Sequence, residues 1–452
     1  MATCSRSGDW CGTSVLPCQD MSQGTSQAFG PSTRSLHRLG VVCGIAAGAW
    51  LGAAEVPTKL VGSGLSPFLV SLGMVAGVFV ARWTVPMILK GTGYVFRDIR
   101  EKPHLIVWAI LAGSLWAVAN TLTIFAIRDV GLSIAFPLWN TNSLIGLLWG
   151  WLLFGELSGS RQRYRVLGGA AAITAGAWVL AYASSVHSGG SASRVGIGIT
   201  AALGAGMLWG TMYIPYRKAY LSGMNPLSFV TVFTFGELGS MLALAAALDG
   251  GFQHLASELV SARSALFWLF LAGFCWVLGD LFQQFAAKYI GLGRGIPLSN
   301  TNQLWGLAWG ALVFGEMAGK DTVARTLIIC GSIVMAAGAW VVSSAEAPDS
   351  ERARWRGAVE RECLRYGLRR DRLIASLEGR ETLEISKQNR SRRNAFDLAL
   401  VLGAIAIFVW LATTARRQPV AISPIPMAIL TAATLALLVV GGLLLWQRTR
   451  FS

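Results

Sequence analysis

Residues 136–157 read "FPLWNTNSLIGLLWGWLLFGEL", and residues 296–317 read "IPLSNTNQLWGLAWGALVFGEM". The 21 residues that begin at Pro137 and the 21 that begin at Pro297 are identical at 14 positions without a gap. Each stretch is long and apolar enough to cross a bilayer, yet each carries Asn-Thr-Asn near its middle. Polar groups at that depth need hydrogen-bond partners. The repetition therefore predicts two related spans whose polar residues have the same role.

The similarity extends toward the N-terminus of each copy. The run "AGSLWAVANTL" from Ala112 corresponds to "AGFCWVLGDLF" from Ala272, which lies 160 residues later. Apolar windows of about 20 residues place five spans in one repeat unit. Because five is odd, the second copy must cross the membrane in the opposite sense, and inverted repeats build secondary transporters with a site at their interface. Chance similarity between Leu- and Gly-rich helices is the alternative, which the shared Asn, Thr and Glu disfavour.

The composition also favours a membrane protein. The 452 residues are 54% hydrophobic and 13% charged, with a mean hydropathy of +0.53, whereas soluble proteins are about a quarter charged. The net charge of +15 is concentrated between the apolar segments, so it reflects membrane orientation better than nucleic-acid binding. We therefore expect a lipid bilayer around the chain and no nucleic-acid partner.

The predicted fold class is an all-α polytopic membrane protein, with a ten-helix inverted 5+5 repeat bundle and a C-terminal two-helix transmembrane hairpin. Its twelve spans lie near 40–62, 67–89, 104–127, 132–154, 164–183, 196–216, 226–248, 265–287, 292–314, 324–343, 395–415 and 424–446. The predicted parts are a disordered tail at 1–39, five-span repeats at 40–183 and 184–343, a basic cytoplasmic segment at 344–394 and the hairpin at 395–452.

Loops rich in Lys and Arg alternate with poorer ones, which predicts a cell-membrane protein with both termini in the cytoplasm. For the basic segment two readings stay open: a helix against anionic headgroups, or a plain solvated linker.

The repeated polar tripeptides are the candidate substrate site. Proline breaks the helix one turn earlier in both copies, and matching broken segments in two halves point to a transporter's binding site. Neutral donors and acceptors suit an uncharged, hydroxylated ligand such as a sugar or polyol. The candidate substrate-binding residues are Trp139, Asn140, Thr141, Asn142, Asn300, Thr301, Asn302 and Gln303. Packing of the tryptophan and hydrogen bonding between helices by the asparagines are the structural alternatives.

Charged residues inside the spans are the candidate proton path. Glu237 lies near the middle of its span and Asp280 slightly past the middle of the next, while Glu55 and Arg82 lie in the inner parts of spans 1 and 2. Charges at this depth by default mark ion or proton pathways. The candidate proton-coupling residues are Asp280, Glu237 and Glu55. A static ion pair of Glu237 with Arg82 is the alternative.

Four residues are candidates for helix breaks or gates: Pro137, Pro297, Glu156 and Glu316. Glu156 and Glu316 close spans 4 and 9, and inversion would place them at opposite membrane faces.

Motifs for chemistry are absent from the sequence. There is no Walker loop, HExxH, GxSxG or CxxC pair, which predicts a protein that is not an enzyme and has no catalytic residues, metal site or cofactor. The expected partners are a small-molecule substrate, protons and lipid, and a homodimer is left open.

The repeated "PLxNTNxLxGLxWGxLxFGE" and the run "WGTMYIPYRKAYLSGMNPL" at 209–227 resemble the drug/metabolite transporter superfamily, most of all its glucose/ribose porter family of sugar-uptake proteins. The resemblance covers residues 40–343 and implies sugar–proton symport by alternating access. The motif residues that it carries over are Pro137, Asn140, Asn142, Glu156, Pro297, Asn300, Asn302 and Glu316. The tail, the basic segment and the last two spans depart from that pattern. They leave a drug or metabolite exporter, or a non-transporting membrane sensor or assembly subunit, as alternatives.

Overall fold

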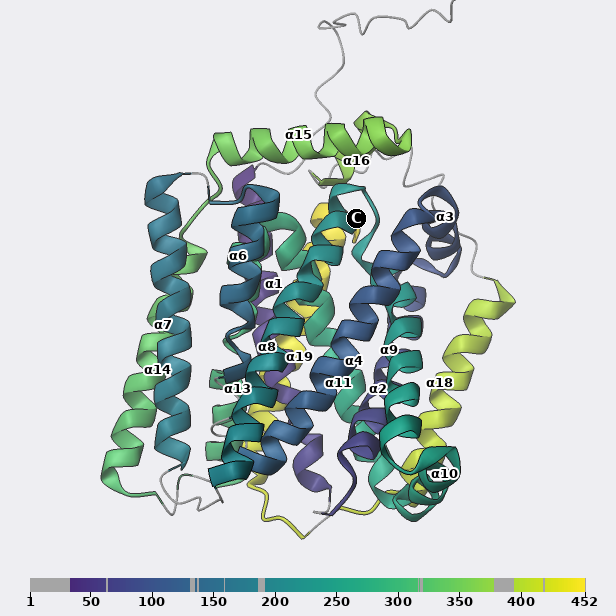
Figure 1. The fold of residues 1–452 in the computed structure, drawn as a ribbon, viewed down its shortest axis with the longest axis vertical. Coiled ribbons are helices and arrows are strands. Elements are labelled where there is room, and N and C mark those ends of the chain that lie inside the picture. Colours follow the sequence, from purple (N-terminus) through teal and green to yellow (C-terminus); the bar gives the residue numbers. More distant parts are fainter. Residues whose placement is uncertain are drawn as a thin grey trace, which may run out of the picture.

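The computed structural model describes residues 33–61, 64–130, 135, 138–157, 159–185, 192–315, 317, 320–377, 394–417 and 419–451. Within these residues the regular structure is helical, without a β-strand. Most helices stand side by side in one bundle, and α15 (Asp349–Tyr366) lies across one end of it (Figure 1). We call this end the α15 face, and the opposite end, where α10 (Gly251–Ser261) lies, the α10 face.

The core bundle follows the predicted spans closely. Its helices are α1 (Thr33–Ala53), α2 (Pro67–Lys90), α4 (His104–Val130), α6 (Asn142–Phe154), α7 (Ser160–Ser185), α8 (Ala192–Leu221), α9 (Pro226–Leu248), α11 (Arg263–Ile290), α12 (Leu292–Ser299), α13 (Asn302–Ala308), the π-helical turn η2 (Trp309–Val313) and α14 (Thr322–Ser343). In the described part of the chain, nine helices are long and apolar enough to span a membrane, and α6 is a shorter apolar helix. The all-helical, polytopic membrane fold is therefore as predicted.

Several helices lie outside this core. They are the 3-10 turn η1 (Pro57–Leu60), the surface helices α3 (Gly93–Glu101) and α10, the helices α15 and α16 (Arg370–Leu377), and the two C-terminal helices α18 (Ala395–Thr414) and α19 (Pro424–Thr449). The last two do not pack as the predicted hairpin, because α18 packs on α2 and α11 whereas α19 packs on α1 and η2 (Figure 1). Neither α3 nor α10 was expected from the sequence, because both are too short and polar to register as spans.

The helix contacts of the core come in matching pairs. The α1–α11 contact corresponds to α8–α4, the α2–α11 contact to α9–α4, and the contact of α1 with α13 to that of α8 with α6. Two further contacts, α7–α14 and α2–α9, join equivalent helices of the two halves, and α6 also contacts α12, the helix that precedes its counterpart α13. A duplicated unit packed about a pseudo-twofold axis produces this pattern.

Glycines at equivalent positions let these helices approach closely. A side chain at Gly77 of α2 would collide with the backbone of Phe270 in α11, and one at Gly236 of α9 with the backbone of Ile110 in α4. Small residues at such crossings are typical of membrane helices, where packing rather than the hydrophobic effect drives association. The same device therefore stabilises the same crossing in both halves.

The two halves run in opposite senses through the bundle. The end of α6 lies at the α15 face, because the amide of Leu157 donates to the Glu351 carboxylate of α15 over 3.1 Å. The equivalent end of η2 lies at the α10 face, where Val313 O accepts from the amide of Ser423, just before α19. Thr33 and Phe451, near the two ends of the described chain, both lie at the α15 face, since Arg448 donates to Ser35.

The basic segment is folded onto the core in its described part. Glu351 and Val359 of α15 are fully buried, so residues 349–377 are not a plain solvated linker. The predicted disordered tail lies almost wholly outside the described residues, as do 378–393.

Candidate functional site

Both Asn-Thr-Asn segments interrupt a helix at the same point. Asn140 and Thr141 form a turn before α6, and Asn300 and Thr301 form a turn between α12 and α13. In each copy the threonine hydroxyl donates over 2.7 Å to the carbonyl three residues earlier, Leu138 O and Leu298 O. The same carbonyls accept from the threonine amides only at 3.3 Å, so the hydroxyls give them a second, shorter bond where water is absent.

The breaks lie deep in the bundle. The 13 residues of α6 separate one turn from the α15 face by about 20 Å, and the 8 residues of α12 separate the other by about 12 Å, at 1.5 Å per residue. A bilayer core is about 30 Å thick, so both turns lie in its interior. Pro297 lies inside α12, three residues before the turn, whereas Pro137 lies outside the described residues.

A helix of the opposite half packs on each break, and a glycine stands at the contact. A side chain at Gly48 of α1 would collide with Thr301, and one at Gly206 of α8 with Thr141 and the backbone of Trp139. Each half therefore supports the broken helix of the other, which places the two turns at the interface between the halves.

The asparagines of the two breaks bond to each other. The Nδ2 group of Asn300 donates to Asn142 Oδ1 at 2.8 Å, Ser143 Oγ at 3.0 Å and Asn140 O at 3.2 Å. All four residues are buried. In this arrangement Asn300 thus forms hydrogen bonds between helices, which is the structural alternative to substrate binding given above.

Three polar atoms of the same segments are buried without a hydrogen-bond partner among the described residues. They are Asn140 Nδ2, Asn302 Oδ1 and Gln303 Nε2. Leaving a buried polar group unpaired costs about 1–3 kcal/mol, so a ligand hydroxyl that bonds to one of these atoms removes that cost. Trp139 instead packs edge-on against Trp209, with ring centroids 6.0 Å apart, which is the packing role offered as the alternative to sugar stacking.

A buried charge cluster lies on α2, α9 and α11. Arg82 pairs with Asp280 at 2.8 Å and with Glu237 at 3.4 Å, and none of the three side chains is exposed. The Arg82 guanidinium also lies over the Phe233 ring, 4.2 Å from its centroid. The structure thus contains the predicted ion pair of Glu237 and adds Asp280 to it, so one cation serves two carboxylates.

Within the described part of the chain, one carboxylate oxygen of the cluster has no hydrogen-bond partner, and two further polar side chains continue the hydrogen-bond network from Asp280. Glu237 Oε1 is buried without a hydrogen-bond partner among the described residues. Asp280 Oδ1 accepts from Gln284 Nε2 at 2.7 Å, and Gln284 accepts from the Tyr220 hydroxyl. A carboxylate pair that shares one cation carries a surplus negative charge, which a proton can neutralise.

Gln283 connects α11 to the broken helix. Its Nε2 donates to Ser299 Oγ at 2.5 Å, and Ser299 immediately precedes Asn300. Since Asp280 lies one turn before Gln283 on α11, the charge cluster and the asparagine interface are joined through neighbouring residues of one helix and one hydrogen bond.

Glu55 does not lie in the charge cluster. It occupies the turn between α1 and η1, half-buried, and its backbone carbonyl accepts from Thr58. Glu55 follows the end of α1 at Ala53 but lies within the candidate span Arg34–Leu60, so its proton-coupling role stays a prediction.

Glu156 closes the α15 face between the halves. Its fully buried carboxylate accepts from the amides of Leu292 and Gly293, at 3.1 and 2.9 Å, at the start of α12, and pairs with Arg217 at 3.4 Å. A carboxylate at a helix N-terminus satisfies amides that have no partner within the helix. The predicted capping or gating position of Glu156 has this geometry, whereas Glu316 lies outside the described residues.

Arg294 and Glu351 form a second link at this face, which was not predicted from the sequence. The Arg294 guanidinium, on α12, makes two bonds to the Glu351 carboxylate of α15, at 2.8 and 3.1 Å, and a third to Ala345 O at 2.6 Å. Both side chains are fully buried. Arg294 stands three residues before Pro297 inside the repeated span. A charged residue at that depth was the sequence signal that could have pointed to a buried ion pair. Arg217, taken for a loop charge, is also buried.

One acidic cluster lies outside the spans. Asp249, His254 and Glu258, where α9 meets α10, offer ligand atoms within 4.8 Å of one another. Asp249 accepts from Ser66 at 2.5 Å, and burial beside Asp249 raises the pKa of Glu258. These contacts are those of a hydrogen-bonded connection between helices.

The comparisons with known proteins agree with this architecture. Residues 196–338 match the EamA-like transporter family. This part of the chain is an EamA-like transporter domain. The resemblance to the drug/metabolite transporter superfamily, to which the family belongs, is thus confirmed over these residues, and the nine apolar helices of the described chain make it a multi-pass membrane protein.

Two curated relatives match beyond chance. "Transmembrane protein 144 homolog A" of Dictyostelium discoideum is 36% identical over 110 residues, which are 24% of this chain and 26% of that protein. The chain therefore matches only about a quarter of that relative's length. "Putative ribose uptake protein RbsU" of Lactiplantibacillus plantarum is 25% identical over 248 residues, 52% of this chain and 78% of that protein. A solved crystal structure matches at a TM-score of 0.45 and 16% identity, over 67% of this chain and 98% of its own.

Proposed function

We propose that the protein is a proton-coupled carrier that takes up a sugar or a similar neutral polyol by alternating access. The observation that carries this proposal is the meeting of two oppositely oriented broken helices in the interior of the bundle, with Asn300 bonded across to Asn142 and Ser143. Inverted-repeat transporters bind their substrates at such an interface. The similarity to a protein described as a putative ribose uptake protein supports the substrate class.

The substrate would take over the hydrogen bonds of the asparagine interface. Its hydroxyls replace the acceptors that Asn300 now uses and engage the unpaired atoms of Asn140, Asn302 and Gln303. Each hydroxyl both donates and accepts, so a polyol satisfies this mixed set without introducing a charge. Trp139 is left as a packing residue.

A proton would bind at the carboxylates that share Arg82. Protonation of Asp280 removes one charge of the pair and weakens its 2.8 Å link to Arg82. The freed Asp280 and Gln284 lie on the same helix as Gln283, which holds Ser299 beside Asn300. The balance between the two open states therefore depends on the proton through differential contacts of α11.

The α15 face would be the cytoplasmic gate. Basic residues crowd this face, which is the cytoplasmic signature, and both described chain ends lie there. Opening there requires α12 to separate from Glu156 and Arg294 to separate from Glu351. These bonds join α12 to the first half and to α15. They would therefore break and re-form as one half moves against the other.

The test is uptake into proteoliposomes with an imposed pH gradient. Radiolabelled ribose and other monosaccharides should accumulate when the gradient is applied, and a protonophore should abolish the accumulation. Transport of bulky amphiphiles in place of sugars would assign the exporter function instead. Binding of a ligand without any transport would assign a membrane sensor.

A truncation that ends at Ser344 separates the carrier from its C-terminal part. The cut also removes Glu351, the ion partner of Arg294. The truncated chain is therefore also tested with Arg294→Leu, which removes the unpaired charge. Normal uptake by both truncated chains would make residues 345–452 accessory, whereas loss of uptake in both would place them in the transport cycle.

A further inference from the structure

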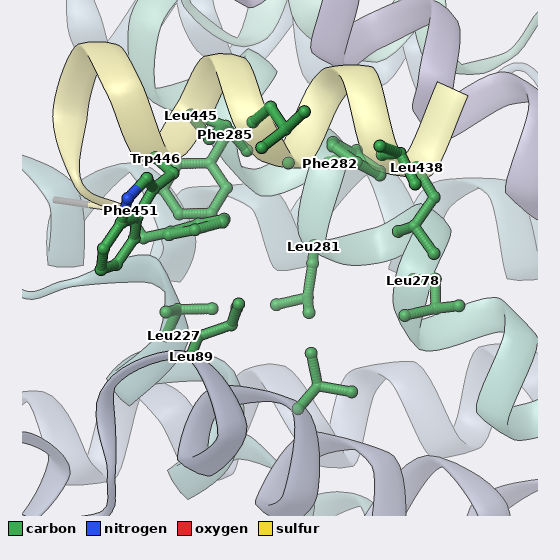
Figure 2. A pocket seen from close by; sticks show the side chains of 14 residues that line it. Leu89, Leu227, Leu278, Leu281, Phe282, Phe285, Leu438, Leu445, Trp446 and Phe451 are labelled. Carbon is green, nitrogen blue, oxygen red and sulfur yellow. The ribbon is translucent and has the colours of Figure 1, made fainter. Parts of the chain in front are cut away.

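An apolar cavity lies between the core and the C-terminal helix α19, away from the asparagine interface. Its volume is about 450 Å³, and its walls come from α2, α9, α11 and α19. Figure 2 shows the side chains that line it, among them Leu89, Leu227, Leu281, Phe285, Leu438 and Trp446. Its lining residues are apolar throughout, so the cavity provides no partners for the polar substrate proposed above.

Fixed points along α19 hold the cavity open. Near its middle, Thr434 O accepts from Trp50 Nε1 of α1 at 3.1 Å. Beyond its end, Phe451 O accepts from Asn225 Nδ2 at 2.6 Å. Between them, Gly441 packs against α11, since a side chain there would collide with the ring of Phe282. The helix is thus fixed on either side of a space that its own side chains do not fill.

The cavity opens toward the bilayer. Val439 and Leu443, which line it, are 56% and 52% exposed in the isolated chain, and a residue exposed at this depth faces lipid. Water needs two to four polar partners in a cavity, and this lining offers none. An apolar cavity of about 150 Å³ already accepts benzene, so the larger space here suits a longer hydrocarbon.

Cations lie at the mouth of the cavity on the α15 face. The guanidinium of Arg450 lies 4.6 Å from the centroid of the Trp446 ring, which forms part of the cavity wall. Lys90 follows the lining residue Leu89, with its ammonium 5.7 Å from the Tyr94 ring. The nearby acid Asp98 is already paired with Lys102 at 3.2 Å. Aromatic and basic residues at this level are typical of a lipid headgroup region.

We propose that this cavity binds one acyl chain of an anionic phospholipid, with the headgroup phosphate against Arg450. The lipid links α19 to helices of the core that carry the charge cluster. Val85 of the cavity wall lies one turn after Arg82, and Leu281 lies one residue after Asp280. A bound chain therefore packs against α2, α9 and α11, the three helices that carry the charge cluster. This site is independent of which substrate the carrier moves.

The experiment uses the full chain in liposomes that contain phosphatidylglycerol with a diazirine on one acyl chain. After illumination, labelled peptides should come from residues 278–285 and 437–446. Native mass spectrometry of the protein extracted in mild detergent should show one retained phosphatidylglycerol in preference to phosphatidylcholine. Arg450→Ala should remove that preference while leaving acyl labelling in place.

Gly442→Leu is the cavity-filling variant, because a side chain at Gly442 meets nothing within 4 Å. Filling the space should lower labelling and retention by about tenfold. Gly403→Leu on α18 is the matched control, since Gly403 also has open space around it but does not line the cavity; it should behave as the wild type.

Equal labelling of wild type and Gly442→Leu, or labels spread evenly over the lipid-facing helices, would overturn the proposal in favour of an ordinary lipid annulus. Displacement of the label by an amphiphilic drug, but not by unlabelled phosphatidylglycerol, would overturn it in favour of a drug site.

Discussion

Asn120 and Asp280 stand at equivalent positions in the two halves of the core, 160 residues apart, and have different surroundings. Asn120 Nδ2 donates to Ser71 Oγ on α2 at 2.6 Å, a neutral bond between two helices. Asp280 instead pairs with Arg82, also on α2, and with Gln284. Asn120 therefore makes a neutral link at the position where its counterpart Asp280 joins a charged cluster.

This contrast separates what the duplication retains in both halves from what it does not. The glycine crossings, the helix breaks and the threonine–carbonyl bonds occur in both halves, so they belong to the scaffold. The carboxylates that share Arg82 occur in one half only. A residue that tunes a single proton site needs no counterpart, whereas a residue that shapes both halves does.

The largest effect is expected for removal of Arg82. Arg82→Ala leaves Glu237 and Asp280 buried without a cation, and loss of one partner from a buried ion pair costs about 3–5 kcal/mol. Thermal unfolding in detergent should show a strongly lowered midpoint. Arg128→Ala is the control, since the half-exposed Arg128–Asp129 pair should contribute under about 1 kcal/mol. Equal midpoints for the two variants would refute the cluster's role.

Loss of the α15 contact ranks next. Glu351→Gln leaves the buried Arg294 without its ion partner and should lower the free energy of unfolding by about 3 kcal/mol. The same helix supplies a matched control in Glu360→Gln, because Glu360 and Arg370 pair at 3.7 Å with both side chains more than half exposed. That variant should lose less than about 1 kcal/mol. A smaller loss for Glu351→Gln than for its control would contradict the buried link.

Charging the neutral half tests the comparison in reverse. Asn120→Asp places a carboxylate against Ser71, with no arginine in the position that Arg82 has beside Asp280. An unpaired charge inside a membrane protein costs about 2.5–3.5 kcal/mol. Unfolding should occur at a lower temperature at pH 8 than at pH 5, because protonation removes the cost. A stability equal to the wild type at both pH values would show that the halves are interchangeable.

The smallest effects are expected at the asparagine interface. Asn300→Ala removes bonds to Asn142, Ser143 and Asn140 and should cost about 1 kcal/mol of stability. Asn302→Ala removes an amide whose Oδ1 has no partner among the described residues, so it should leave stability unchanged. Both should raise the KM for sugar uptake several-fold. Unchanged uptake in both would remove these residues from the substrate site.

The sequence predicts the scaffold well because the duplication repeats its signals. The odd span count predicts the inversion, and the repeated prolines predict a break in each of the two spans. The break in the second copy lies at Asn300–Thr301, three residues after Pro297, which itself lies inside α12. It also identifies Arg82, Glu237 and Asp280 as buried charges, and the pairing of Arg82 with Glu237.

What the sequence does not predict depends on contacts between distant segments. That Asn300 reaches across to Asn142 follows only from how the halves dock. Arg217 and Arg294 resemble ordinary loop and span-end charges until Glu156 and Glu351 lie beside them. Glu351 itself stands at the start of a basic segment that contains several acids. Nothing in the neighbouring sequence indicates which of these acids is buried. The apolar cavity likewise depends on where α19 is fixed against the core.

The most direct test makes the charged half like the neutral one. Asp280→Asn reproduces the residue at position 120 and should be assayed in proteoliposomes by sugar accumulation under a pH gradient and by sugar counterflow without one. Accumulation should disappear while counterflow persists, because the substrate amides are intact and only the proton site is lost. Accumulation at the wild-type level would contradict the assignment of the proton site to Asp280.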